Sequence, residues 1–561
     1  MFSQITFRIK IMKTKLYLFA AILCCTVSLQ AQNCYSGTCG ENLTWRINTP
    51  NEYEYCYPRE NGDTLYIEGY GTMDDYNDAY GTPWRNAQYI YDIKYISLPN
   101  GLTHIGKYAF SQMGNESNYL FVEIPNTVST IGNYAFWYSY IYTLNIPNSV
   151  TTIGKYAFHG CHLYSINIPS SVTLIDTGAF RYCWVYDGFN VAADNPNYSS
   201  LNGFLCNKEQ TIIIQCPVNK FDDNFAISNS IVTIGRYAFA GCELLRNIII
   251  PNSVTTIEDY AFSGCLIQSI DIPNSVISIG KGSLGGQQLN SINVVSDNPN
   301  YSSINGVLFN KSQDTLILYP TGRIGTYSIP EGVTTIMESA FSGCSKLTAI
   351  NFTNNITDIG VGAFYYCSSL VSVVIPDGIS IIRSSAFGDC ENLSLITIGK
   401  NVKTIEYYAF AGSAALREIT IPEGVITIGG SAFAGYNLAT VTISSTVTNI
   451  ERGAFLSANL ETVYNYAAVP QIVTRDVFCS SSTNQWENEI NATLYVTEES
   501  VALYQAADVW KEFNPILPLP PAEGLENPSV NLGDTHKFLH NGNVYILTGD
   551  KTYTLTGQEI K

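Results

Sequence analysis

The sequence predicts a β-rich solenoid, in which one short backbone unit is repeated and stacked along an axis. The main sign is an Ala-Phe pair that recurs along the chain, usually every 22 or 23 residues. Around the pair, the phrase IPNSVTTIGKYAFHGC (146–161) returns almost unchanged, for example as IPNSVTTIEDYAFSGC (250–265). A period in the twenties is typical of solenoids with one supersecondary unit per repeat. The Phe position of the pair, including two degenerate copies, is occupied by Phe110, Phe136, Phe158, Phe180, Phe239, Phe262, Leu284, Phe341, Phe364, Phe387, Phe410, Phe433, Phe455 and Phe478.

The strand of each unit is predicted from local alternation. In LYSINIPSSV (163–172) the apolar Ile166 and Ile168 flank the polar Asn167, which is typical of a short strand with one buried face. Pro169 then ends the strand, because proline cannot donate to a β ladder. The chain turns back inward, the Phe fills the core, and the small Ala lets successive coils nest. The coils are therefore expected to share a parallel sheet.

Two long gaps in the repeat carry related inserts. The first reads DNPNYSSLNGFLCNKEQTIIIQCP (194–217), and the second reads DNPNYSSINGVLFNKSQDTLILYP (297–320). The Asp-Asn-Pro-Asn start has turn chemistry, and the remainder predicts a hairpin around NKEQ and NKSQ. We expect two hairpin inserts, near 194–220 and 297–323.

These motifs resemble those of the BspA-like leucine-rich repeat proteins, which are surface and secreted proteins of bacteria, common in Bacteroidetes. The resemblance covers residues 93–515 and rests on IPxxVxxIGxxAFxxC, the LxxIxIP strand and the DNPNYSSxNG insert. Residues 33–92 resemble the N-terminal β cap of such proteins, and 492–513 resembles their closing repeat. The resemblance implies a curved right-handed superhelix of 22–23-residue coils, displayed outside the cell and binding other macromolecules. Members of the family have been linked to adhesion.

The first 32 residues are predicted to be a signal peptide. Lys13 and Lys15 precede the apolar run LYLFAAILCCTVSL, and the expected cut follows Ala31 or Gln32. A lipid anchor on Cys24 is disfavoured, because the residue directly before it is not small. We therefore expect a secreted protein, extracellular or attached to the outer surface. No later segment approaches the roughly 20 apolar residues of a membrane span, so no membrane insertion is expected.

The C-terminal region is predicted to hold a linker and a small β tail. Residues 516–534 are rich in proline and are expected to form a stiff linker. In 535–561 two alternating runs meet at Gly549-Asp550, which predicts a β-hairpin. The tail resembles the end of a Bacteroidetes sorting signal, and a small appended β module is the alternative.

Charge and motif content restrict the function. The formal net charge of −18 argues against binding to nucleic acid or to bare anionic lipid. The five histidines form no HExxH motif, and the chain contains no GxSxG elbow and no P-loop. Asp74, Asp75 and Asp78 lack the spacing of an EF-hand, so we expect them in a solvated loop. We expect no catalysis, no cofactor and no metal site.

Most of the 15 cysteines are expected to be buried thiols. Seven stand three residues after the Phe position, where a free Cys behaves as a small hydrophobe. They are Cys161, Cys183, Cys242, Cys265, Cys344, Cys367 and Cys390. Cys206 and Cys216 of the first insert are expected to be separate packing sites, because a tight hairpin places them too far apart for a disulfide. One bridge is plausible among Cys34, Cys39 and Cys56, and the choice of pair stays open.

Three consecutive coils supply the candidate binding residues. The fourth residues after the Phe are Tyr140, His162 and Trp184, and the sixth are Tyr142, Tyr164 and Tyr186. The intervening Ile141, Leu163 and Val185 should point inward, so alternation turns both flanking columns outward. Rungs about 5 Å apart then give two exposed aromatic ladders, which suit a protein or glycan ligand. The alternatives are cross-strand pairing that only stiffens the sheet, or cover from a neighbouring loop.

The sequence therefore favours a secreted or cell-surface binding protein, adhesin-like, that recognises host or bacterial macromolecules through the solenoid surface. A structural spacer or surface-layer component is the alternative, and an enzyme is the least favoured class. Caps at both ends argue against end-to-end stacking, so the chain is expected to be monomeric.

Overall fold

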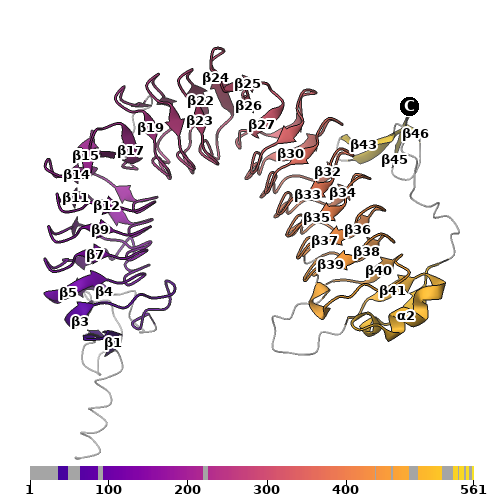
Figure 1. Cartoon of the computed structure of the whole chain (residues 1–561), viewed down its shortest axis with the longest axis horizontal. Helices are drawn as coiled ribbons and strands as arrows, with labels where there is room; N and C mark the ends of the chain where they lie inside the picture. The colour runs from indigo at the N-terminus through magenta and orange to yellow at the C-terminus, as the bar shows by residue number, and fades with distance from the viewer. Residues whose placement is uncertain are drawn as a thin grey trace, which may run out of the picture.

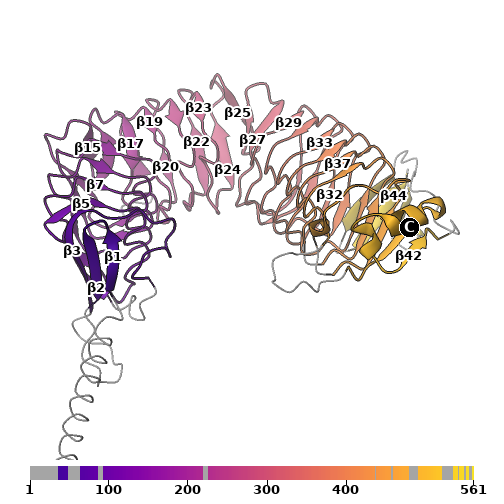
Figure 2. The same ribbon diagram turned by 60° about the horizontal axis from the view of Figure 1, so that its bottom comes forward.

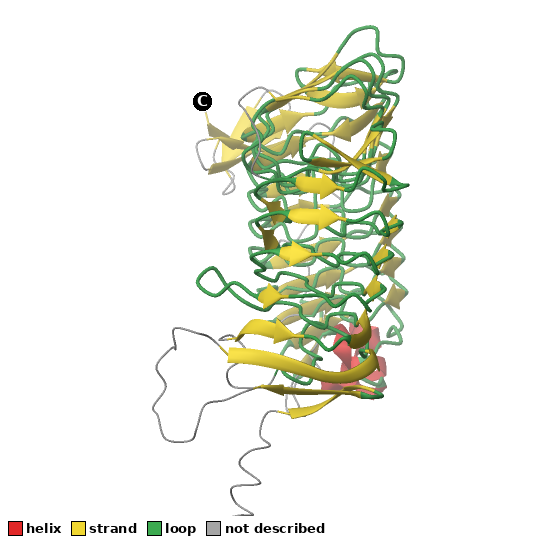
Figure 3. Ribbon diagram, turned by 90° about the vertical axis from the view of Figure 1, so that its left-hand side faces the viewer, coloured by secondary structure: helices red, strands yellow, loops and turns green. Residues whose placement is uncertain are grey.

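The computed structural model describes residues 36–47, 63–85, 93–218, 225–435, 437–456, 459–478 and 490–520, with the backbone of 535–540, 543–548, 551–554 and 559–560. The predicted signal peptide lies outside the described residues. The chain forms a parallel β-solenoid of about 18 turns with coils of about 23 residues, bent into an arch (Figure 1). Strand and loop make up nearly all of it (Figure 3). The predicted fold class is confirmed.

The predicted strands form the first of two ladders along the arch. Where a coil contains the Ile-Pro step, its strand ends at or near that step, and strands of adjacent coils pair in parallel. The members are β4 (Ile93–Ser97), β6 (Phe121–Val122), β8 (Leu144–Asn145), β11 (Ile166–Ile168), β14 (Phe189–Val191), β18 (Phe225–Ala226), β20 (Ile248–Ile249), β22 (Ser269–Ile272), β24 (Ser291–Val294), β28 (Gly325–Ser328), β30 (Leu347–Asn351), β32 (Ser372–Val374), β34 (Leu395–Thr397), β36 (Glu418–Ile421), β38 (Thr440–Ile443), β40 (Thr462–Asn465), β41 (Thr493–Val496) and β42 (Ile516–Pro518).

A second parallel ladder, which was not predicted, runs beside the first (Figure 2). It is built from the Thr-Ile pair of the VTTIG phrase. Ile153 is fully buried, while the Thr151 hydroxyl donates to the carbonyl of Ser129 one coil earlier at 3.3 Å. At Gly154 the two coils approach closely, since a Cβ there would lie 2.8 Å from the backbone of Asn133 and of Gly132. The members are β5 (Gly101–Ile105), β7 (Thr130–Ile131), β9 (Thr152–Ile153), β12 (Leu174–Ile175), β19 (Thr233–Ile234), β21 (Thr256–Ile257), β23 (Ser278–Ile279), β29 (Thr335–Ile336), β31 (Asp358–Ile359), β33 (Ile381–Ile382), β35 (Thr404–Ile405), β37 (Thr427–Ile428) and β39 (Asn449–Ile450).

The Phe side chains form stacked columns through the core. Phe364, Phe387 and Phe410 are fully buried, with centroid separations of 5.0 and 5.4 Å and nearly parallel planes. The N-terminal end of the column is closed by Trp84, which stacks on Phe110 at 5.8 Å. The other end is closed by an edge contact at 5.3 Å between Phe478 and Trp510. The degenerate copies keep their register, although the smaller Leu284 leaves a small cavity beside Phe262.

The ends of the solenoid carry their own elements. In the N-terminal cap, β1 (Ser36–Gly40), β2 (Leu43–Ile47) and β3 (Asp63–Thr72) are antiparallel, and β3 then pairs in parallel with both β4 and β5. At the other end lie the short helices η2 (Arg475–Val477), η3 (Glu498–Ser500), α2 (Val501–Ala506) and η4 (Trp510–Glu512). The ladder ends on β42, three residues into the range expected to be linker.

Each insert is a three-stranded antiparallel meander, one strand more than predicted. The first contains β15 (Tyr198–Leu201), β16 (Phe204–Asn207) and β17 (Ile212–Gln215), and the second contains β25 (Tyr301–Ile304), β26 (Val307–Asn310) and β27 (Thr315–Leu318). Their third strands join the second ladder. In the tail, the predicted hairpin is present as β44 (Asn543–Thr548) and β45 (Lys551–Thr554), flanked by β43 (Thr535–His540) and β46 (Glu559–Ile560).

The repeated cysteines lie where the repeat predicted them. Cys161 and Cys265 donate to the carbonyls of Phe136 and Phe239, one coil earlier, at 2.8 and 3.0 Å. Burial raises the pKa of these thiols, so they remain protonated at neutral pH. The cysteines that are buried and free, as predicted for the repeat, are Cys161, Cys183, Cys265, Cys344, Cys367 and Cys390.

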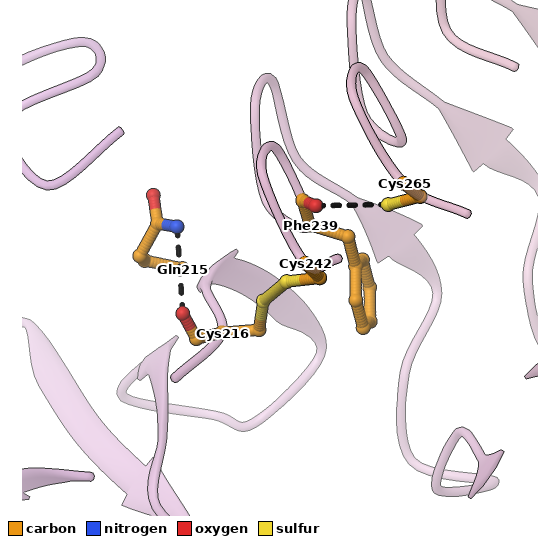
Figure 4. Close-up of a disulfide and its surroundings, with 5 residues drawn as sticks. All are labelled: Gln215, Cys216, Phe239, Cys242 and Cys265. Carbon is orange, nitrogen blue, oxygen red and sulfur yellow. Dashed lines mark hydrogen bonds between the residues drawn. A yellow bond between two sulfur atoms is a disulfide. The ribbon is translucent and has the colours of Figure 1, made fainter. Parts of the chain in front are cut away.

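The prediction for two cysteines is wrong. Cys216 and Cys242 form a disulfide, with Cα atoms 7.8 Å apart, where two free thiols were expected (Figure 4). Cys216 occupies the Phe position of the coil that the insert adds, because its amide donates to the carbonyl of Ala238 as the Phe239 amide does to Ala261. Cys242 therefore packs against the sulfur of Cys216, at the position where an aromatic ring packs against the equivalent cysteine in other coils.

The remaining cysteine expectations have mixed outcomes. Cys206 is a buried free thiol opposite Ile213, so the prediction that it does not bond to Cys216 is confirmed. Cys39 is also buried and free. Cys34 and Cys56 lie outside the described residues, so the bridge expected in that group stays a prediction.

Candidate functional site

The structure stacks Tyr140, His162 and Trp184 into one column, called here the inner stack. β10 (His162–Leu163) pairs in parallel with β13 (Trp184–Val185), and a bridge joins Tyr140 to His162. Ring centroids are 4.3 Å apart between Tyr140 and His162 and 5.5 Å apart between His162 and Trp184, with planes within 9°. The parallel register of these short strands thus brings the three rings into a continuous stack.

The second predicted column is the more exposed of the two. Tyr142, Tyr164 and Tyr186 are 49, 54 and 46% exposed, and Tyr142 stacks on Tyr164 at 6.3 Å. Leu163 and Val185, which precede two of these rings, are fully buried. Alternation therefore separates core from surface at this place as the pattern predicted.

This column continues toward the N-terminus through two residues that sequence reasoning missed. Phe121 lies 6.0 Å from Tyr142 and 5.4 Å from Tyr95, and both extra rings are more than two-fifths exposed. Phe121 stands eleven residues after Phe110 instead of six, and Tyr95 has no Ala-Phe pair before it, so counting from the Phe does not find them. Tyr95, Phe121, Tyr142, Tyr164 and Tyr186 are called here the aromatic row.

A neighbouring loop partly covers the inner stack, which was expected to be exposed. Tyr119 makes edge contacts with Tyr140 at 6.0 Å and with Tyr142 at 6.1 Å. All three residues of the inner stack are half-buried. Burial lowers the pKa of His162, against a smaller opposing effect of Glu116, so its imidazole is neutral at pH 7. The aromatic row is consequently the main accessible part of the site.

A further tyrosine column at the corner of the coils was not predicted. Tyr108, Tyr134 and Tyr156 stand two residues before their Phe, have φ near +57°, and are 4.7 and 5.2 Å apart. Lys107 and Lys155 lie over the outer rings of this set at 5.2 and 5.3 Å, as cation–π partners. The signal was visible in the repeated KYAF and NYAF phrases.

His159 is buried inside an aromatic cluster next to this column. Tyr138, Tyr156 and Tyr182 surround its ring edge-on at 5.1 to 5.5 Å, and its Nδ1 has no hydrogen-bond partner among the described residues. Desolvation, with a smaller contribution from Arg181, lowers the pKa of His159 to about 4. The neutral imidazole is therefore the form compatible with the folded coil.

His159 should make the protein sensitive to acid. A histidine whose pKa is lowered by folding takes up a proton more readily in the unfolded chain, so stability falls as pH drops from 6.5 toward 4. The loss should approach about 3 kcal/mol, with a slope of at most about 1.4 kcal/mol per pH unit. Urea unfolding of the full chain at pH values between 7 and 4 measures this loss of stability. His159→Phe, which keeps a ring in a position where Trp137 stands one coil earlier, should flatten this dependence; an unchanged pH profile would contradict the assignment.

The described residues contain no metal-ligand cluster and no helix that could span a membrane. Within them, no three His, Cys, Asp or Glu side chains come together as metal ligands would. In the same part of the chain, every helix is too short or too polar to cross a membrane. The loop of Asp74, Asp75 and Asp78 is exposed, and the Asp75 carboxylate accepts from the backbone of Lys107 at 2.6 Å.

Comparison with known proteins identifies the repeat. A family model for the BspA type leucine rich repeat region matches in six copies, over residues 88–186, 218–321, 317–435 and 357–485. These ranges cover more than half of the chain. The chain belongs to the BspA-type leucine-rich repeat family. Such solenoids are generally non-catalytic and typically serve as protein-interaction surfaces. No curated protein matches the sequence.

Several solved structures are similar to this BspA-type chain. A leucine-rich repeat protein from Eubacterium ventriosum is 24% identical, with a TM-score of 0.38, and the match covers 71% of this chain and 94% of that one. The pneumococcal vaccine antigen PcpA is 18% identical with a TM-score of 0.38, covering 86% and 98%. A leucine-rich cell surface protein from Faecalibacterium prausnitzii is 22% identical with a TM-score of 0.36, covering 81% and 97%.

Proposed function

We propose that this chain is a secreted or outer-surface binding protein, adhesin-like, which recognises a host or bacterial macromolecule. The single observation that carries the proposal is the aromatic row, a line of exposed rings on the first coils in which neighbouring rings contact one another from Tyr95 to Tyr164. The protein acts as a monomer, without catalysis or cofactor, and residues 1–32 direct its export.

The aromatic row has the physical character of an interaction surface. Its five residues are 43 to 54% exposed, which corresponds to about 500 Å² of exposed surface in total. Patches of this size on soluble proteins often mark binding sites. Tyrosine is also among the residues enriched in binding hot spots, because one rigid ring supplies both apolar area and a polar tip.

A triple substitution tests the proposal. Tyr142→Ser, Tyr164→Ser and Tyr186→Ser remove three rings of the aromatic row and leave the buried residues between them intact. Binding of the full chain to an extracellular-matrix extract from mucosa and to a glycan array should fall by about tenfold or more. The matched control carries Tyr80→Ser, Tyr366→Ser and Tyr407→Ser, three exposed tyrosines outside the aromatic row, the first in the N-terminal cap and the other two on later coils.

The control variant should bind like the wild type, and both variants should unfold at the same urea concentration as the wild type. Equal binding by the wild type and the row variant would show that the row is structural. A wild-type chain that binds neither the extract nor any glycan would favour the alternative of a spacer or surface-layer component.

A further inference from the structure

We propose that the aromatic row binds a cationic amphipathic α-helix of a partner protein, laid along the axis of the solenoid. This inference rests on the proposed binding role of the same surface and names the class of its partner. It is carried by the orientation of the rings, by their spacing and by the charges beside them.

The orientation of the rings disfavours face-on stacking of sugars. Within the row, Tyr95 and Phe121 are inclined by 24°, and Tyr142 and Tyr164 by 22°, with centroids 5.4 and 6.3 Å apart. A group inserted between two rings needs two contacts of at least 3.5 Å, which is about 7 Å between ring planes. The inner faces are therefore closed, and the row offers ring edges and phenol oxygens. Such a ridged surface suits apolar side chains that lie across the edges.

The spacing of the rings matches the repeat of a helix. Successive centroids from Tyr95 to Tyr164 are 5.4, 6.0 and 6.3 Å apart. An α-helix rises 5.4 Å per turn and about 6.0 Å between residues i and i+4, so each turn can place one side chain against one coil. An extended strand presents side chains on one face only every 6.6 Å or so and loses register along the row. About three helical turns, some 12 residues, span the four rings from Tyr95 to Tyr164.

The charges beside the row are mainly negative. Glu123 comes directly after the strand that carries Phe121, Asp187 follows Tyr186, and Glu116 lies in the loop next to Tyr119. All three carboxylates are exposed, and within the described residues none of them forms an ion pair. The whole chain carries a net charge of −18. A partner helix with an apolar stripe flanked by Lys or Arg therefore complements this surface in both shape and charge.

Two peptides of one composition test the inference. The probe is an 18-residue peptide with Leu on one helical stripe and Lys elsewhere, and its comparison carries the same residues in strict alternation. By fluorescence anisotropy with the full chain, the helical pattern should bind more tightly than the alternating one. The variant with Tyr142→Ser, Tyr164→Ser and Tyr186→Ser should weaken helix binding by about tenfold or more, whereas the Tyr80, Tyr366 and Tyr407 control should not. Equal binding of both peptides, or equal binding of the helix by row variant and wild type, would overturn the inference.

A parallel measurement of glycan binding distinguishes two results: that only the helical partner is wrong, or that the proposed binding function is wrong as well. Glycan binding that depends on the three tyrosines, without binding of the helical peptide, would overturn the helix and leave the binding role in place. If the row variant binds extract, glycans and peptides as the wild type does, both proposals fall. A further variant neutralises the acidic side chains beside the row, with Glu116→Gln, Glu123→Gln and Asp187→Asn. It should bind the helical Leu/Lys peptide more weakly than the wild type does. An unchanged affinity would overturn the inference that the partner helix is cationic.

Discussion

Replacing Phe387 with Ala should lower the free energy of unfolding by about 3–5 kcal/mol. The Phe387 ring is fully buried and stacks on Phe364 and Phe410, each belonging to an adjacent coil. Its loss removes contacts on both faces and leaves a cavity that the two ladders prevent from collapsing. Because coils of a solenoid are stabilised by their neighbours, the defect weakens two interfaces at once. Urea unfolding of the full chain measures the change.

Two companion variants make this result specific. Phe387→Leu should cost less, because Leu284 already occupies the equivalent position in another coil. Tyr407→Ala, an exposed aromatic in the next coil, should change stability by less than about 0.5 kcal/mol. A Phe387→Ala protein within about 1 kcal/mol of the wild type, by the same criterion, would show that the Phe column is not a main source of stability.

Replacing Asn298 with Ala should cost about 3 kcal/mol or more. The Asn298 side chain is fully buried at the start of the second insert. Its amide nitrogen donates to the carbonyls of Pro273 and Val276 at 2.8 and 2.9 Å. Its oxygen accepts from the amides of Asn300 and Tyr301 at 2.9 and 2.8 Å. Truncation leaves four backbone groups without this partner, and each buried group then carries a desolvation cost.

The neighbouring asparagine provides the control. Asn300 is exposed and makes one side-chain bond, to the carbonyl of Ile277 at 2.8 Å, so Asn300→Ala should cost about 1 kcal/mol or less. Asn298→Asp keeps the acceptor but turns an oxygen toward two carbonyls, and it should be no more stable than Asn298→Ala. Equal urea midpoints for the Asn298→Ala and Asn300→Ala proteins would contradict this role.

The repeat made most of the architecture predictable. A Phe every 22 or 23 residues must occupy equivalent places in successive coils, so the core and the degenerate copies at Leu284 and Phe478 followed from the spacing. The first ladder followed from the spacing together with the alternation within each strand. The second ladder did not, because a Thr-Ile pair is too short to show alternation. Its pairing comes from the adjacent coil rather than from the segment itself.

The candidate site was predictable only where the register was regular. The inner stack and three rings of the aromatic row were found by counting from the Phe. Tyr95 and Phe121 escaped that count, and the cover from Tyr119 depends on a loop conformation. The Cys216–Cys242 disulfide was missed because the insert hides a coil: Cys216 stands 23 residues before Phe239, in the position of the ring.

By itself, the sequence determined the unit and its repetition: strand, proline stop, inward turn, Phe and Cys. These features are local, and a fixed period carries each of them from one coil to the next. The tertiary structure decided which side chains meet across coils, including the second ladder, the disulfide and the ring contacts of the aromatic row. Those contacts depend on the number of residues between equivalent positions, which the inserts and the N-terminal cap alter, and on three-dimensional stacking at about 5 Å, which brings residues far apart in sequence into van der Waals contact.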